Sequence, residues 1–112
     1  MNITQRRDGT TLHLALSGRL DAIGAITLEK EMKQAFKEMA DAFKPAKRIE
    51  LDFAETDYLS SAGLRVLLST AKYMKHVSGT THLLNLSPQV LSTLQLTGLA
   101  SSPLLTIVQA RV

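Results

Sequence analysis

The alternation of apolar and polar positions near the N-terminus predicts a β-hairpin. In TLHLALS, the run from Thr11 to Ser17, leucine takes every second position, so one face of the run is apolar, as in a half-buried strand. Asp8-Gly9 separates this run from an earlier extended one, and Asp-Gly supplies the positive backbone angles of a two-residue hairpin turn. We therefore expect a hairpin over residues 2–17, ended by the sequence SGRLD.

From about Ile23 to Phe43 the apolar positions follow the period of a helix. They recur at steps of three and four residues, while glutamates and lysines take the other faces, which is typical of a long amphipathic helix. Asp21 lies where it can cap the start of this helix, and Pro45 disfavours continuation because the residue before a proline is pushed out of helical geometry. The expected buried stripe contains Leu28, Met32, Ala35, Phe36, Met39 and Phe43.

A strand and a second helix follow. Ile49, Leu51 and Phe53 alternate with acidic residues, which predicts a short strand. The helix begins behind two serines and ends near Gly79, which offers a turn. Its expected buried stripe contains Leu64, Leu67, Leu68, Ala71 and Met74.

The remaining residues predict a strand, a helix and a strand. THLLNL (81–86) and LLTIV (104–108) are the strands, and the helix between them has Ser87 as N-cap, a proline at its first position and Gly98 just past its end. Because strands alternate with helices after the hairpin, we expect an α/β fold, with a mostly parallel central sheet, an N-terminal hairpin and amphipathic helices packed on the sheet. In such sheets functional loops follow the carboxyl ends of the strands, where SGRLD (17–21) and ETDYLSSAG (55–63) lie.

The composition suits one globular domain over residues 1–112. Hydrophobic residues make up 45% of the chain and charged residues 21%, and the absence of cysteine excludes disulfides. No apolar run approaches the roughly 20 residues that span a bilayer, and the N-terminus lacks the apolar segment of a secretory signal, so we expect a cytoplasmic protein without direct membrane insertion. The net charge of +3 indicates solubility more than an acidic partner.

Few residues indicate catalysis or metal binding. Ser60 and Ser61 lie outside a G-x-S-x-G elbow, so a serine-dependent enzyme is a weak alternative. The histidines (His13, His76 and His82) lack the spacing that places two imidazoles on one helix face, and we expect no metal and no cofactor. An acidic cluster (Asp52, Glu55 and Asp57) suits weak magnesium binding, but such loops are more often simply solvated. Motifs for nucleotide or nucleic-acid binding are missing.

The two serines stand at the start of a helix, where one hydroxyl suffices as a cap worth about 1 kcal/mol. Phosphorylation of a serine adds about 1.5 to 2 negative charges. A helix N-terminus favours such an anion by roughly 0.3 to 1 kcal/mol, whereas a partner covering it is opposed by several kcal/mol. Since about 1.4 kcal/mol is tenfold in affinity, phosphorylation here can switch binding without unfolding the domain.

The order of elements, together with SGRLD, IELDFAETDYLSSAGLRVLL and LSTLQLTGL, resembles the STAS domain over nearly the whole chain. Within that family it is similar to the stand-alone bacterial anti-sigma factor antagonists. The resemblance implies a non-enzymatic protein that, when unphosphorylated, binds a histidine-kinase-like anti-sigma factor and frees a sigma factor. It also implies phosphorylation by that kinase and reactivation by a PP2C-type phosphatase.

Carried over by motif, the phosphorylated residue is Ser61. Ser60 stands where the family usually has an aspartate and is a second candidate acceptor. The partner-binding residues implied are Asp21, Asp52, Asp57, Ser60, Ser61, Ala62 and Gly63. One alternative is a STAS subunit with a constitutive docking role, for example in a lipid-transport ABC complex. Another is a binding domain in which Ser61 is a plain helix cap.

Overall fold

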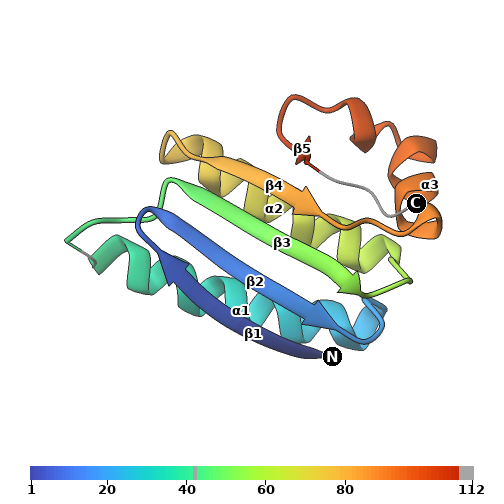
Figure 1. Ribbon diagram of the computed structural model, residues 1–112, viewed down its shortest axis with the longest axis horizontal. Coiled ribbons are helices and arrows are strands. Elements are labelled where there is room, and N and C mark those ends of the chain that lie inside the picture. Colours follow the sequence, from blue (N-terminus) through green and yellow to red (C-terminus); the bar gives the residue numbers. More distant parts are fainter. Residues whose placement is uncertain (42, 109–112) are drawn as a thin grey trace.

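A five-stranded sheet forms the centre of the fold, and helices α1 and α2 lie together behind it in Figure 1. The computed structural model describes residues 1–41 and 43–108. The strands are β1 (Asn2–Asp8), β2 (Thr11–Ser17), β3 (Arg48–Glu55), β4 (Thr80–Leu84) and β5 (Thr106–Ile107). The helices are α1 (Ala22–Asp41), α2 (Ser61–His76) and α3 (Pro88–Leu96), followed by a short 3-10 turn, η1 (Leu99–Ser101).

The strands lie in the sheet in the order β1-β2-β3-β4-β5, which is their order along the chain. β1 runs antiparallel to β2, while the pairs β2–β3, β3–β4 and β4–β5 are parallel. The predicted fold class, a mostly parallel sheet with an N-terminal hairpin, is therefore confirmed.

The hairpin turn lies one residue later than the sequence predicts. Asp8 pairs with Thr11, so the turn residues are Gly9 and Thr10 rather than Asp8 and Gly9. Gly9 has a φ of +60°, while Asp8 still belongs to β1. A glycine with positive φ at the first central position is the arrangement of a type II′ turn, whose twist matches that of the flanking strands.

The hydrophobic core lies between the sheet and α1 and α2. It contains the alternating leucines of β2, the apolar residues of β3 and most of the predicted helical stripes. Phe43 lies outside it, because α1 ends at Asp41 and the phenylalanine side chain is 97% exposed, and Leu68 of the predicted α2 stripe is only partly buried and does not belong to the core. Residue 42, which the predicted helix included, lies outside the described residues.

The two C-terminal strands are shorter than predicted, and the helix between them has the predicted caps. β4 stops before Asn85, whose backbone is left-handed with a φ of +56°. The Ser87 hydroxyl caps α3 by accepting from the Val90 N–H at 3.1 Å, and Gly98, with a φ of +78°, follows the helix. Residues 109–112, which the expected domain includes, are not among those described. Across the described chain, every helix is too short or too polar to cross a membrane.

Candidate functional site

Two loops meet at the carboxyl end of the sheet, where the topology predicts functional residues. They begin at the last residues of β2 and β3 and comprise residues 17–21 and 55–60. The Leu20 N–H donates to the Tyr58 carbonyl at 3.1 Å, and the Leu20 carbonyl accepts from the Ser60 N–H at 2.9 Å. These bonds extend the parallel pairing of β2 and β3 beyond the strands, so the N-termini of α1 and α2 are held side by side.

Both helices begin with a polar cap followed three residues later by glycine. The Asp21 carboxylate accepts from the Gly24 N–H at 2.8 Å, which confirms the predicted cap of α1. The Ser60 hydroxyl accepts from the Gly63 N–H at 3.1 Å, so Ser60 is the N-cap of α2. Each cap satisfies one of the backbone N–H groups that a helix start leaves unpaired.

Each of these glycines lies where a loop packs against the first helical turn. A β-carbon at Gly63 would lie 2.7 Å from Leu20 Cγ and 2.9 Å from the Leu59 Cδ1 methyl, and both leucines are buried. A β-carbon at Gly24 would overlap the Arg19 carbonyl oxygen. The close contact between loop and helix therefore requires glycine at both positions.

Ser61 and Ser60 have different environments although they are adjacent. Ser61 is the first residue of α2 and is exposed, while Ser60 is partly buried at the cap. Over residues 1–41 and 43–108, only Ser60 of the two has a hydrogen bond through its hydroxyl. The Ser61 hydroxyl is therefore available to another molecule without disturbing the helix.

The remaining predicted binding residues fall into two groups. Asp57 is exposed in the loop before α2, and Ala62, the residue after Ser61, is partly buried in the first turn of that helix. Asp52 lies on β3, where it alternates with the buried Leu51 and Phe53 and so faces away from α1 and α2.

Exposed apolar side chains lie in the first turns of α1 and in the loop before α2, and the sequence reasoning did not include them. Ile23 and Ile26 in the first turns of α1 are 75% and 58% exposed, and Tyr58 is 42% exposed. The Arg19 guanidinium lies 4.1 Å from the centre of the Tyr58 ring, a cation–π contact. The sequence did contain a pattern that could have predicted this surface. Two isoleucines lie three residues apart at the start of the helix, and neither belongs to its buried stripe. Large exposed aliphatic side chains grouped in this way are typical of protein-binding surfaces.

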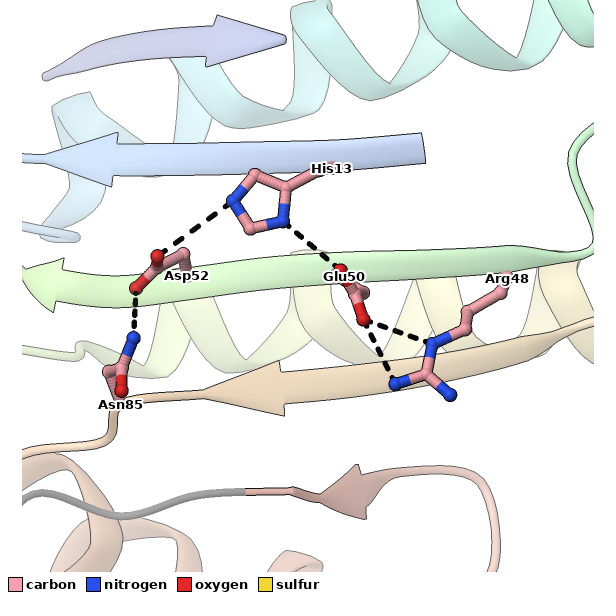
Figure 2. Close-up of polar contacts among 5 residues, drawn as sticks. All are labelled: His13, Arg48, Glu50, Asp52 and Asn85. Atoms are coloured by element: carbon pink, nitrogen blue, oxygen red, sulfur yellow. Dashed lines mark hydrogen bonds and ion pairs between the residues drawn. The ribbon is translucent and has the colours of Figure 1, made fainter. Parts of the chain in front are cut away.

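A polar network occupies the sheet face opposite α1 and α2 (Figure 2). The His13 Nδ1 atom lies 3.2 Å from Glu50 Oε1, and the Arg48 guanidinium lies 2.9 Å from Glu50 Oε2. Burial alone raises the pKa of Glu50, but the hydrogen bonds from His13 and Arg48 outweigh it, so the pKa of this carboxyl lies below its usual range.

The network continues from His13 to the end of β4. His13 Nε2 lies 3.8 Å from Asp52 Oδ2, and Asp52 Oδ1 accepts from Asn85 Nδ2 at 3.0 Å (Figure 2). Asp52 is thus engaged within the chain, and its predicted role in partner binding stays a prediction. Within the part of the chain that the structure describes, no three histidine, aspartate or glutamate side chains form a group that could hold a metal ion.

Comparison with known proteins identifies relatives along nearly the whole chain. A family model described as the STAS domain matches residues 2–110. The chain is 34% identical over 101 residues to the "Putative anti-sigma factor antagonist BtrV" of Bordetella bronchiseptica, with 90% of this chain and 82% of that protein covered.

Solved structures with the same fold include the anti-sigma factor antagonist SpoIIAA in two forms. The unphosphorylated form has a TM-score of 0.74 at 23% identity, with 96% of this chain and 88% of that chain covered. The phosphorylated form, described as a Bacillus cell fate determinant, has a TM-score of 0.70 at 22% identity, with 96% and 91% covered.

Proposed function

The chain belongs to the STAS domain family and is similar to an anti-sigma factor antagonist, and from this premise we propose that it is a phosphorylation-switched antagonist acting as a single domain over residues 1–112. With Ser61 unphosphorylated, it binds a kinase-type anti-sigma factor, and the sigma factor is released. Phosphorylation of Ser61 by that kinase ends the binding, and a PP2C-type phosphatase restores it. The protein itself catalyses no reaction.

The exposed hydroxyl of Ser61 carries this proposal. Because Ser60 supplies the N-cap of α2, a phosphate on Ser61 removes no hydrogen bond from the helix. The phosphate also lies at the positive end of the helix dipole, which favours an anion. Phosphorylation therefore leaves the fold intact. The two phosphorylation states of SpoIIAA have been solved with folds that both match this chain, in agreement with such a switch.

The surroundings of Ser61 explain how the phosphate would end binding. A partner that covers Ser61 together with the exposed Ile23, Ile26 and Tyr58 removes water from the start of α2. A phosphate there must then be desolvated or paired within the interface, where mismatched charges cost several kcal/mol. A loss of about 3 kcal/mol corresponds to roughly 100-fold in affinity, which is enough for a switch.

The test combines phosphate mapping with binding. The full chain is incubated with a purified kinase-type anti-sigma factor from the same organism and ATP, and mass spectrometry locates the phosphate, which we expect on Ser61. Ser60→Ala should leave the acceptor position unchanged. In binding assays Ser61→Ala should bind the kinase and Ser61→Asp should not. Ser92→Asp, which places the same charge on an exposed position of α3, should bind like the wild type.

Two results would count against the proposal. One is a phosphate on Ser60 while Ser61 stays unmodified. The other is equal affinity of the wild type and Ser61→Asp for the kinase. Binding that is constant whatever stands at position 61 would instead favour a constitutive docking role.

A further inference from the structure

β3 contains a bulge where it leaves the sheet toward Ser61. The pairing of Ala15 with Asp52 is followed by that of Ser17 with Glu55, so two residues of β3 stand opposite one residue of β2. A bulge of this kind bends the strand and changes the direction of the chain that follows it. The chain that follows here is the loop leading to Ser61.

The Asp52 carboxylate stabilises this bulge by hydrogen bonding. Its Oδ1 atom accepts from the Ala54 N–H at 2.9 Å, at a point where the extra residue disrupts the regular ladder. The same oxygen accepts from the Asn85 side chain at 3.0 Å, and Asn85 is the left-handed residue that follows β4. Asp52 thus connects the bulge in β3 to the start of the segment between β4 and α3.

The His13 imidazole lies on the side of the other oxygen of this carboxylate. The imidazole lies between Glu50 and Asp52, at 3.2 Å and 3.8 Å respectively (Figure 2). The three side chains are only 17% to 21% exposed, so solvent screens their charges less than at a fully open surface. Histidine is the side chain whose charge ordinarily changes between about pH 5 and 8.

Of the two carboxylates beside His13, Asp52 is the one that loses its cationic partner when the imidazole becomes neutral. Glu50 keeps a second cation, Arg48, when the imidazole is neutral. Arg6, the residue paired with His13 on β1, is exposed, and His82, the residue paired with Glu50 on β4, lies beyond that glutamate. The helices α1 and α2 pack on the other face of the sheet.

We propose that His13 is a positioning residue for Ser61, acting through Asp52 and the β3 bulge. When the imidazole is protonated it holds the Asp52 carboxylate in place, and the bulge and the loop after it keep one geometry. When the imidazole loses its proton, this restraint is lost and the loop is less ordered. The coupling is a property of the chain alone, while its biological meaning rests on the proposed function of Ser61.

The coupling can be measured by NMR on the full-length, isotope-labelled chain between about pH 5 and 8, the range over which histidine titrates. In the wild type, the amide signals of Ala54 and Ser61 should shift with the same midpoint as the His13 ring. In His13→Gln this transition should disappear. In Asp52→Asn the ring should still titrate, but the two amides should no longer follow it. His76→Gln, at an exposed histidine that ends α2, is the control and should behave like the wild type.

The inference fails if the Ala54 and Ser61 amides do not follow the His13 midpoint, or if they shift unchanged in His13→Gln. This measurement needs no kinase, so its outcome is independent of whether Ser61 is phosphorylated. Where the kinase does act on Ser61, its affinity for the wild type should fall about two- to five-fold from the acid to the alkaline side of the midpoint, the effect of one partly exposed ion pair. His13→Gln should show no such change.

Discussion

The two serines at the start of α2 should respond differently to replacement by alanine. Ser60→Ala removes the hydroxyl that accepts from the Gly63 N–H at 3.1 Å and leaves that N–H without its cap. Ser61→Ala removes an exposed hydroxyl at the first helical position. If Ser60 alone is the cap, only the first change should destabilise the protein.

The size of each effect follows from the position of the side chain. Loss of a serine N-cap typically costs about 1 kcal/mol, within a range of roughly 0.5 to 2. At Ser61 no cap is lost, and alanine has the higher helix propensity, so the expected change is within about 0.5 kcal/mol of zero. For a chain of this length, a loss of about 1 kcal/mol lowers Tm by about 4 °C.

Urea denaturation followed by circular dichroism measures both variants. Ser87→Ala is the positive control. The Ser87 hydroxyl caps α3 by accepting from the Val90 N–H at 3.1 Å, so its removal should also cost about 1 kcal/mol. Ser92→Ala, at an exposed position of α3, is the neutral control. A Ser61→Ala variant that loses as much stability as Ser60→Ala would refute the assignment of separate roles to the two serines.

Three further predictions follow from the same site and its surroundings. Gly63→Ala places a β-carbon 2.7 Å from Leu20 Cγ. We expect the overpacking to destabilise the protein by about 1 to 3 kcal/mol, which exceeds the roughly 1 kcal/mol that alanine gains over glycine in a helix. Equal or higher stability of the variant in urea denaturation would contradict this. Burial, with a smaller contribution from Arg48, lowers the pKa of His82 in the native state below its ordinary value of 6.5. As the pH falls, the unfolded chain therefore binds a proton at His82 more readily than the native state does. Stability should therefore fall as the pH drops through that ordinary value, and His82→Gln should flatten this part of a stability curve measured at a series of pH values; an unchanged slope would contradict the argument. Ile26→Ser, at a side chain that is 58% exposed, should reduce affinity for the anti-sigma factor about tenfold and leave Tm unchanged in calorimetry, whereas unaltered affinity would exclude Ile26 from the interface.

The periodic parts of the fold could be predicted because their signal is local. The alternating leucines of β2 and the stripe of α1 each lie within one segment, and burial follows directly from the period. Phe43 was misplaced because the pattern continues past Asp41, where the helix itself stops. The turn at Gly9 was misplaced by one residue because Asp-Gly fits two hairpin turns that differ only in register.

The candidate site was predictable in its location but not in its internal bonds. The loops after β2 and β3 were expected at one edge of the sheet, and they meet there. Either Ser60 or Ser61 suits a helix cap by residue type, and only the backbone geometry assigns the cap to Ser60. The position of Asp52 beside His13 depends on the pairing of two strands far apart in the sequence, which no local pattern contains.

The agreement between strand order in the sheet and strand order along the chain bears on how the protein folds during synthesis. Each strand pairs with the one made just before it, so no strand has to wait for a distant segment, and loop-closure costs stay small. The paired loops at residues 17–21 and 55–60 are complete once β3 and α2 have left the ribosome. The surface around Ser61 can therefore assemble before α3 and β5 are translated. The strands of the C-terminal third then extend the sheet from the edge that β3 has formed.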